Sequence, residues 1–98
     1  MQENYYASVC HHGAQGGAVR LTDELFLFKC QKASIEDAFK RIEIPYANIK
    51  KILCKTKFFI SPIVTIEQYK GETYKFLIFN AERFINTMKN KGINISRR

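Results

Sequence analysis

Three adjacent residues, Cys10, His11 and His12, carry the side chains in this sequence most suggestive of metal binding or nucleophilic catalysis. Thiolate and imidazole groups are zinc ligands, and a thiol beside a histidine can act as a nucleophile. Three consecutive side chains do not easily converge on one ion, and the other cysteines, Cys30 and Cys54, lie far away in sequence. No third group that would orient a cysteine–histidine pair is identifiable. The sequence therefore predicts a surface loop here, with a structural zinc as the alternative, and a protein without catalytic residues or cofactor.

Basic residues in the middle of the chain offer a second chemistry, the binding of anions. The net charge is +7 over 98 residues, and residues 29–57 hold +5 of it, with eight basic side chains against three acidic ones. The eight are Lys29, Lys32, Lys40, Arg41, Lys50, Lys51, Lys55 and Lys57. If the strands that carry them pair, several would converge at one rim and could hold a phosphate, an acidic partner or an anionic membrane. The alternative is a solvated sheet edge, where lysines discourage aggregation between strands.

Aromatic residues near these lysines suggest a rival function, the binding of nucleic acid. Phe58, Tyr69 and Tyr74 could stack on bases. Most aromatic residues, however, occupy the alternating positions that a small core needs, and no recognisable RNA-binding signature is present. Nucleic acid is therefore the alternative to a protein or lipid partner.

The cysteines and the first residues indicate an intracellular protein. The three cysteines are widely spaced in apolar or strand-like contexts, which favours reduced, buried thiols over disulfides. Residues 1–6 lack the pattern of a secretory signal, and no apolar run approaches the roughly 20 residues that span a bilayer. We expect a cytoplasmic chain without a transmembrane segment, with peripheral attachment to the inner membrane face as one form of that location.

The elements that would position these residues are mostly short β-strands. Val19 and Leu21 alternate with Arg20, and Tyr74, Phe76 and Ile78 alternate in the same way, the period-two pattern of half-buried strands. The predicted strands cover residues 5–10, 18–22, 25–30, 42–44, 49–55, 60–69 and 74–79. Strands 18–22 and 25–30 are predicted to form one antiparallel hairpin, and strands 60–69 and 74–79 a second one. Residues 11–17 form a flexible glycine-rich connection, and residues 31–41 form either a short helical turn or a loop.

One amphipathic helix follows the last strand directly, over about residues 80–91. Asn80 is the expected N-cap, because its side-chain oxygen can accept from a free amide of the first turn. Phe84, Ile85 and Met88 share one face, and Gly92 can adopt the left-handed conformation that ends a helix. Residues 93–98 are predicted to be a fraying C-terminal tail.

This order of elements predicts one mainly β domain over residues 1–98, with its core at about residues 5–92. Two antiparallel sheets folded over each other leave an open end, and an amphipathic helix can plug it. The predicted fold is a barrel or sandwich of about seven antiparallel strands capped by one C-terminal α-helix.

Several stretches also carry a family resemblance. They are a glycine pair with the hairpin after it (residues 16–29), an Ile-Pro step (42–49), a Tyr-x-Phe strand (71–76) and the helix pair Phe84-Ile85. Together they resemble the bacterial branch of the GRAM domain, which belongs to the pleckstrin-homology superfold, and the resemblance covers residues 7–89. The sequence departs from the family at Leu25, where a basic residue is common, and at Phe84, where tryptophan is common.

The resemblance implies a non-enzymatic intracellular module that binds proteins or lipids, phosphoinositides in eukaryotic examples. In lipid-binding pleckstrin-homology domains the loop that grips inositol phosphates joins the first two strands, and the corresponding residues 11–17 contain no lysine or arginine. Arg20 lies just beyond and could partly substitute. The combined prediction is a cytoplasmic binding or scaffolding module that recognises a partner protein or an anionic membrane lipid through Arg20 and the basic segment.

Overall fold

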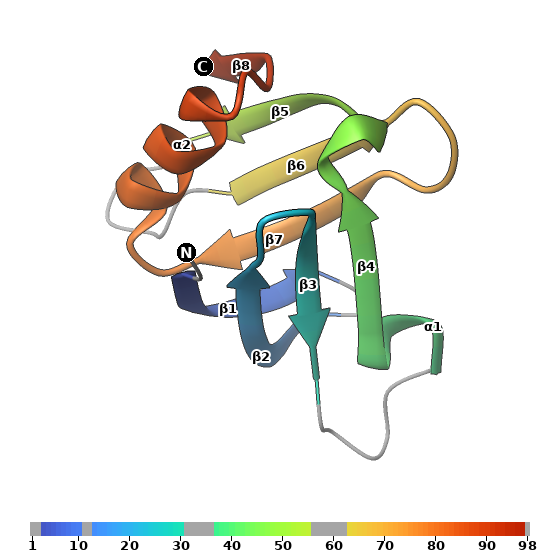
Figure 1. Cartoon of the computed structure of the whole chain (residues 1–98). Helices are drawn as coiled ribbons and strands as arrows, with labels where there is room; N and C mark the ends of the chain where they lie inside the picture. Colours follow the sequence, from blue (N-terminus) through green and yellow to red (C-terminus); the bar gives the residue numbers. More distant parts are fainter. Residues whose placement is uncertain (1–2, 11–12, 31–36, 56–62, 98) are drawn as a thin grey trace.

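The computed structural model describes residues 3–10, 13–30, 37–55 and 63–97, which form eight strands, two helices and one 3-10 turn (Figure 1). The strands are β1 (Glu3–Cys10), β2 (Ala14–Leu21), β3 (Leu25–Lys29), β4 (Arg41–Pro45), β5 (Ile49–Lys55), β6 (Ile63–Gln68), β7 (Tyr74–Ile78) and β8 (Ile95–Arg97). The helices are α1 (Asp37–Lys40) and α2 (Ala81–Asn90), and the 3-10 turn η1 is Tyr46–Asn48.

All eight strands belong to one open sheet, in the order β4-β3-β2-β1-β7-β6-β5-β8. Neighbours are antiparallel except for β8, which runs parallel to β5. Figure 1 shows β5, β6 and β7 crossing the direction of β3 and β4, with α2 at one end of the molecule. The predicted mainly β fold with one C-terminal capping helix is confirmed. The expected number of strands was one too low, because the parallel strand β8 was not foreseen.

The two predicted hairpins form with the core residues in register. In β2 and β3, Val19 faces Phe28 and Leu21 faces Phe26; in β6 and β7, Val64 faces Phe76. These residues are all buried, which is the outcome that the period-two pattern predicts for the inward face of a sheet.

Residues 14–17 of the predicted glycine-rich connection are strand, so the prediction of a flexible segment was wrong for them; residues 11 and 12 lie outside the described residues. β2 begins at Ala14, and Gly16 and Gly17 pair with Ser8 and Ala7 of β1. A Cβ atom at Gly17 would lie 2.2 Å from the carbonyl oxygen of Lys29, so the close approach of β3 requires glycine there. Gly17 therefore serves strand packing, whereas the sequence pattern favoured a loop.

The core between the sheet layers is built around aromatic rings. Phe26 and Phe28 of β3 contact Phe76 of β7 with ring centroids 5.1 and 5.3 Å apart. Phe84 of α2 meets Phe26 at 6.0 Å and Tyr5 of β1 edge-on at 5.6 Å. Phe84 is fully buried, so the helix is docked on the core as predicted.

The sequence predicted the C-terminal end of α2 correctly but not the hydrogen bond at its N-terminal end. Asn80 precedes the helix with φ 60°, and its side chain makes no capping hydrogen bond, so the predicted N-cap bond is absent. At the other end Gly92 has φ 83°. The Gly92 amide donates a hydrogen bond to the Lys89 carbonyl, and the Ile93 amide donates one to the Met88 carbonyl. This is the Schellman arrangement, in which glycine supplies the left-handed residue.

Residues 93–97 pack against the rest of the fold, which corrects the prediction of a fraying tail. Ile93 is buried, and the Ile52 amide donates to the Asn94 carbonyl at 2.9 Å. Ile95 and Arg97 then pair with Ile52 and Cys54 of β5. A strand of three residues has little intrinsic signal, so its existence depends on the edge that β5 offers.

Between β3 and β4 the described residues 37–40 form α1, so the helical alternative holds there, while residues 31–36 lie outside the described part. Phe39 of α1 packs edge-on against Tyr74 at 6.1 Å.

Candidate functional site

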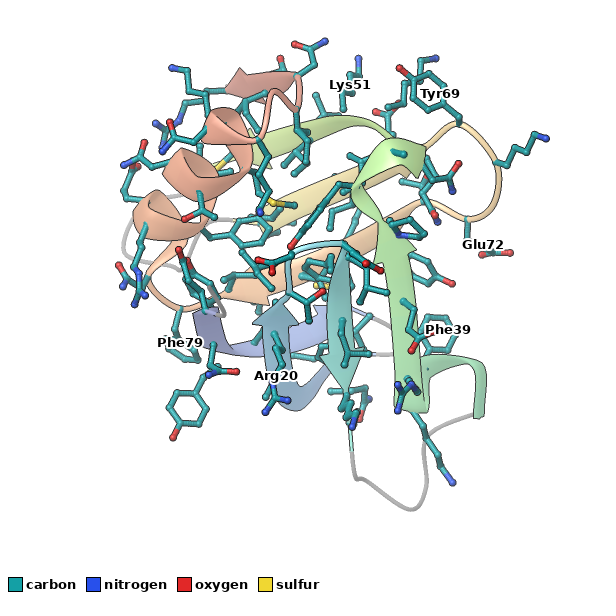
Figure 2. The ribbon with its side chains drawn as sticks, in the orientation of Figure 1. Arg20, Phe39, Lys51, Tyr69, Glu72 and Phe79 are labelled. Atoms are coloured by element: carbon teal, nitrogen blue, oxygen red, sulfur yellow. The ribbon has the colours of Figure 1, made fainter. Side chains whose placement is uncertain are left out.

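The basic residues predicted to share one rim occupy two separate places. Arg20, Lys29 and Arg41 lie on β2, β3 and β4, with Lys40 just before β4, whereas Lys50, Lys51 and Lys55 all lie on β5. Figure 2 shows Lys51 at the top of the molecule and Arg20 well below it, in the lower half of the view. Lys32 and Lys57 lie outside the described residues. The expected convergence of the basic segment into a single rim was therefore wrong.

Strand pairing brings the first group onto one outer surface. Ala18 of β2 is opposite Lys29 of β3, and Lys29 is opposite Arg41 of β4. Arg20 stands two residues along from Ala18, so its side chain points to the same side of the sheet. We call Arg20, Lys29 and Arg41 the cationic face; all three side chains are exposed.

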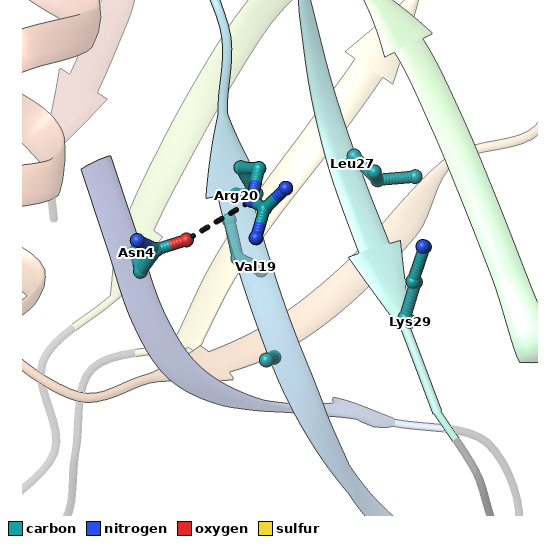
Figure 3. Close-up of a pocket in the computed structure, with 6 residues that line it drawn as sticks. Asn4, Val19, Arg20, Leu27 and Lys29 are labelled. Carbon is teal, nitrogen blue, oxygen red and sulfur yellow. Dashed lines mark hydrogen bonds between the residues drawn. The ribbon is translucent and has the colours of Figure 1, made fainter. Parts of the chain in front are cut away.

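Arg20 is held in place by its neighbour on β1. Its Nε donates to the Asn4 side-chain oxygen at 3.2 Å, a bond drawn in Figure 3. The bond does not use the two terminal nitrogens of the guanidinium, which remain a planar pair of donors suited to a carboxylate or phosphate. Asn4 thereby limits the conformational freedom that Arg20 would lose on binding a ligand.

A pocket of about 100 Å³ lies beside Arg20. Asn4, Ala18, Val19, Arg20, Leu27 and Lys29 line it. Its apolar lining includes Leu27, which points outward yet is only 9% exposed. The arrangement places two cationic side chains around a small apolar floor, which suits a side chain carrying a negative charge on an apolar stem.

An exposed aromatic residue flanks the cationic face, and sequence reasoning missed it. Tyr6 of β1 is opposite Ala18, with 79% of its surface exposed. Its backbone carbonyl accepts from the amide of Phe79, which is itself 60% exposed. Alternation along β1 provided a signal, because Tyr5 and Val9 point into the core and Tyr6 must therefore point outward.

A polar cluster ties β1 to α2 at the edge of the core. The Glu3 carboxylate accepts from the Thr87 hydroxyl at 3.0 Å and from the Tyr5 hydroxyl, and Arg83 Nε lies 3.5 Å away. The Tyr5 hydrogen bond is the main reason why the pKa of Glu3 is lowered. Burial, helped by the bond to Glu3, raises the pKa of Tyr5 to about 12. These groups stabilise the docked helix and do not border the cationic face.

The structure also locates the cysteines. Cys30 and Cys54 are buried as predicted, but Cys10 is exposed, which corrects the prediction for that residue. Desolvation raises the pKa of the Cys10 thiol, the direction opposite to that of an activated nucleophile. His11 and His12 lie outside the described residues; among those described, no group of three or more His, Cys, Asp or Glu could hold a metal ion.

The aromatic residues proposed to stack on bases do not form a platform in the described structure. Tyr74 packs against Phe39 and Phe76, with centroids 6.1 and 6.2 Å apart, and is partly buried. Tyr69 is 66% exposed, and Phe58 lies outside the described residues.

Comparison with known proteins identifies the fold but not the family. No family model matches the chain, and no curated protein matches it. A solved structure, titled "Structure of the Spt16D Pob3N heterodimer", is similar over 100% of this chain with a TM-score of 0.74 and 16% sequence identity. The fold is pleckstrin-homology-like. This pleckstrin-homology-like chain spans about half of the matched one, 54% of its length. The bacterial GRAM assignment stays a prediction.

No helix among the described residues is long and apolar enough to cross a bilayer.

Proposed function

We propose that this chain is a non-enzymatic protein-binding module that acts in the cytoplasm, and that the outer surface of β1, β2 and β3 is where it binds. The observation that carries the proposal is Tyr6, a tyrosine 79% exposed beside the cationic face. Tyrosine and arginine, with tryptophan, are enriched among the residues that dominate the binding energy of protein interfaces. The solved structure with a similar fold is a heterodimer, which supports a protein as the partner.

The family resemblance also implies a more specific function, the binding of lipid, and the basic strand β5 favours it. Lys50, Lys51 and Lys55 all lie on β5, and lysines near an anionic membrane contribute about 1 kcal/mol each. Lys50 and Lys55 are exposed and Lys51 is partly buried. We keep peripheral binding to an anionic membrane through β5 as the second candidate function.

A photoreactive amino acid at position 6 tests the protein-binding proposal. The chain would carry it in place of Tyr6 in cells, and mass spectrometry would identify the crosslinked molecule and the segment attached. We expect discrete protein adducts. Tyr69, also a tyrosine and 66% exposed on a distant turn, is the matched control and should give none of these adducts. The same adduct pattern from both positions, or only lipid adducts from position 6, would contradict the proposal.

A further inference from the structure

A wider depression adjoins the Arg20 pocket on the same face of the sheet. Gly16, Gly17, Ala18 and Lys29 line it, and its volume is about 410 Å³. It shares Ala18 and Lys29 with the pocket, so the two form one continuous hollow. We call this hollow the β2 trough, lined by Gly16, Gly17, Ala18, Arg20 and Lys29.

Small residues in the middle strand create the trough. Gly16 and Ala18 lie on the outer side of β2, and a Cβ atom at Gly16 would meet nothing nearer than the Ser8 hydroxyl at 4.0 Å. Neighbouring strands supply larger side chains on both sides, Tyr6 from β1 and Lys29 from β3. The trough thus follows the direction of β2, a shape that suits an extended segment lying along the strand.

The open shape of the trough favours a polypeptide over a small molecule. Small-molecule sites usually enclose most of the ligand's surface, whereas the larger part of the trough is open to solvent. The pocket beside Arg20 has about 100 Å³, enough for one side chain, and it opens into the shallow depression. An extended peptide turns alternate side chains to the same side, so one can enter the pocket while its backbone lies over Gly16 and Ala18.

The charges around the trough call for an acidic ligand. Lys29 lies directly opposite Arg41, and like charges at such cross-strand positions are destabilising. Arg41 forms an ion pair with Glu43 at 2.7 Å. Among the described side chains that point outward from β2, β3 and β4, Glu43 is the one acidic residue. Positive charge therefore exceeds negative charge on this surface, and an anionic partner would relieve the repulsion.

We propose that the β2 trough binds an extended acidic segment of a partner protein, with one carboxylate side chain at Arg20 and the next alternate one at Lys29. The inference rests on the proposed protein-binding function and specifies the chemistry of the partner. The N–H groups on the two terminal nitrogens of Arg20 donate hydrogen bonds to the carboxylate, while Nε keeps its hydrogen bond to Asn4. Lys29 is a diagonal neighbour of Arg20, and such positions lie about 7–8 Å apart, close to the spacing of alternate residues in an extended chain. A Glu-x-Glu spacing therefore matches both cations.

A peptide-binding experiment tests the inference. The probe is a short fluorescein-labelled peptide with glutamate at every second position, and its control carries glutamine instead; fluorescence anisotropy reports binding. We expect the glutamate peptide to bind more tightly, with an affinity that falls as salt is raised. Arg20→Gln should weaken binding by about ten-fold or more, since a charge-assisted bidentate contact is lost.

Two further variants separate shape from charge. Ala18→Leu leaves the net charge unchanged and places a larger side chain in the trough, so it should weaken binding by about ten-fold as well. Lys50→Gln removes the same charge as Arg20→Gln but from β5, and should leave the affinity within about two-fold. Unchanged melting temperatures would show that each variant is folded.

Several results would overturn the inference. One is equal affinity for the glutamate and glutamine peptides; another is equal loss in the Arg20 and Lys50 variants. Binding of phosphatidylserine vesicles through Arg20, without binding of the peptide, would replace the acidic segment by a membrane. If position 6 crosslinks a partner through a segment without acidic residues, the protein-binding function stands and the acidic-segment inference fails.

Discussion

Replacing Phe84 with alanine tests whether the docked helix holds the two sheet layers together. The ring is fully buried and meets Tyr5 at 5.6 Å and Phe26 at 6.0 Å, both nearly edge-on. Loss of a buried phenylalanine side chain costs about 3–5 kcal/mol. Edge-on aromatic pairs, worth roughly 0.5–1.5 kcal/mol each, place this ring in the upper part of that range. We therefore expect the free energy of unfolding to fall by about 4–5 kcal/mol.

Urea unfolding followed by circular dichroism measures this loss, with linear extrapolation to water. Phe79→Ala is the matched control, because Phe79 precedes the same helix but is 60% exposed, and its loss should stay within about 0.5 kcal/mol. A domain of this size is often stable by only about 5–15 kcal/mol, so Phe84→Ala can leave little folded protein. Phe84→Leu keeps much of the apolar volume and should cost about 1.5 kcal/mol, which remains measurable.

The reasoning is refuted if Phe84→Ala costs less than about 1 kcal/mol, since no fully buried phenylalanine in a packed core should be so dispensable. A Phe79→Ala loss as large as that of Phe84→Ala would refute it too, because the assignment of the two faces of this segment would then be wrong.

Three further predictions concern backbone packing and pH. Gly17→Ala should destabilise by about 3 kcal/mol or more in urea unfolding, because its Cβ would lie 2.2 Å from the Lys29 carbonyl oxygen, while Gly16→Ala should stay within about 0.5 kcal/mol; equal effects would contradict the packing argument. The hydrogen-bonded Glu3 has a lowered pKa, so its contribution to stability is present above the ordinary value of 4.5 and is lost as pH falls through the lower folded value. Glu3→Gln should flatten the acid limb of a stability–pH curve, and an unchanged limb would count against this role. Burial raises the pKa of Tyr46 to about 12, so its contribution is complete below the ordinary value of 10 and is lost as pH rises from 10 to about 12. Tyr46→Phe should flatten the alkaline limb measured by thermal melts, and a limb as steep as before would argue against that pKa.

The residue pattern alone predicted most strands, the two hairpins and the helix. Val19 and Leu21 point into the core, as does the helix face carrying Phe84 and Met88, and Gly92 ends the helix. These features follow from local periodicity and from the conformational preference of single residues, which act whatever the neighbouring elements are.

Local pattern failed where a neighbour decides the structure. Residues 95–97 look like a tail, and they become strand β8 because β5 offers an edge to which they can bond. Gly16 and Gly17 suggest a flexible connection, yet both are in β2 because they pair with Ser8 and Ala7 of β1, and β3 approaches Gly17 too closely for any side chain. In both cases the determining atoms belong to a segment far away in the sequence.

The candidate site shows the same division between sequence and tertiary structure. The amino-acid sequence determined that the chain is basic and that Tyr6 alternates with core residues. It did not determine which cations meet, because that depends on the order and register of strands. Pairing of β1, β2 and β3 places Arg20 and Lys29 beside Tyr6, and the sheet order puts Lys50 elsewhere. Charge and alternation are properties of single strands, whereas a binding surface is made by hydrogen bonds between strands, and only the tertiary structure specifies those.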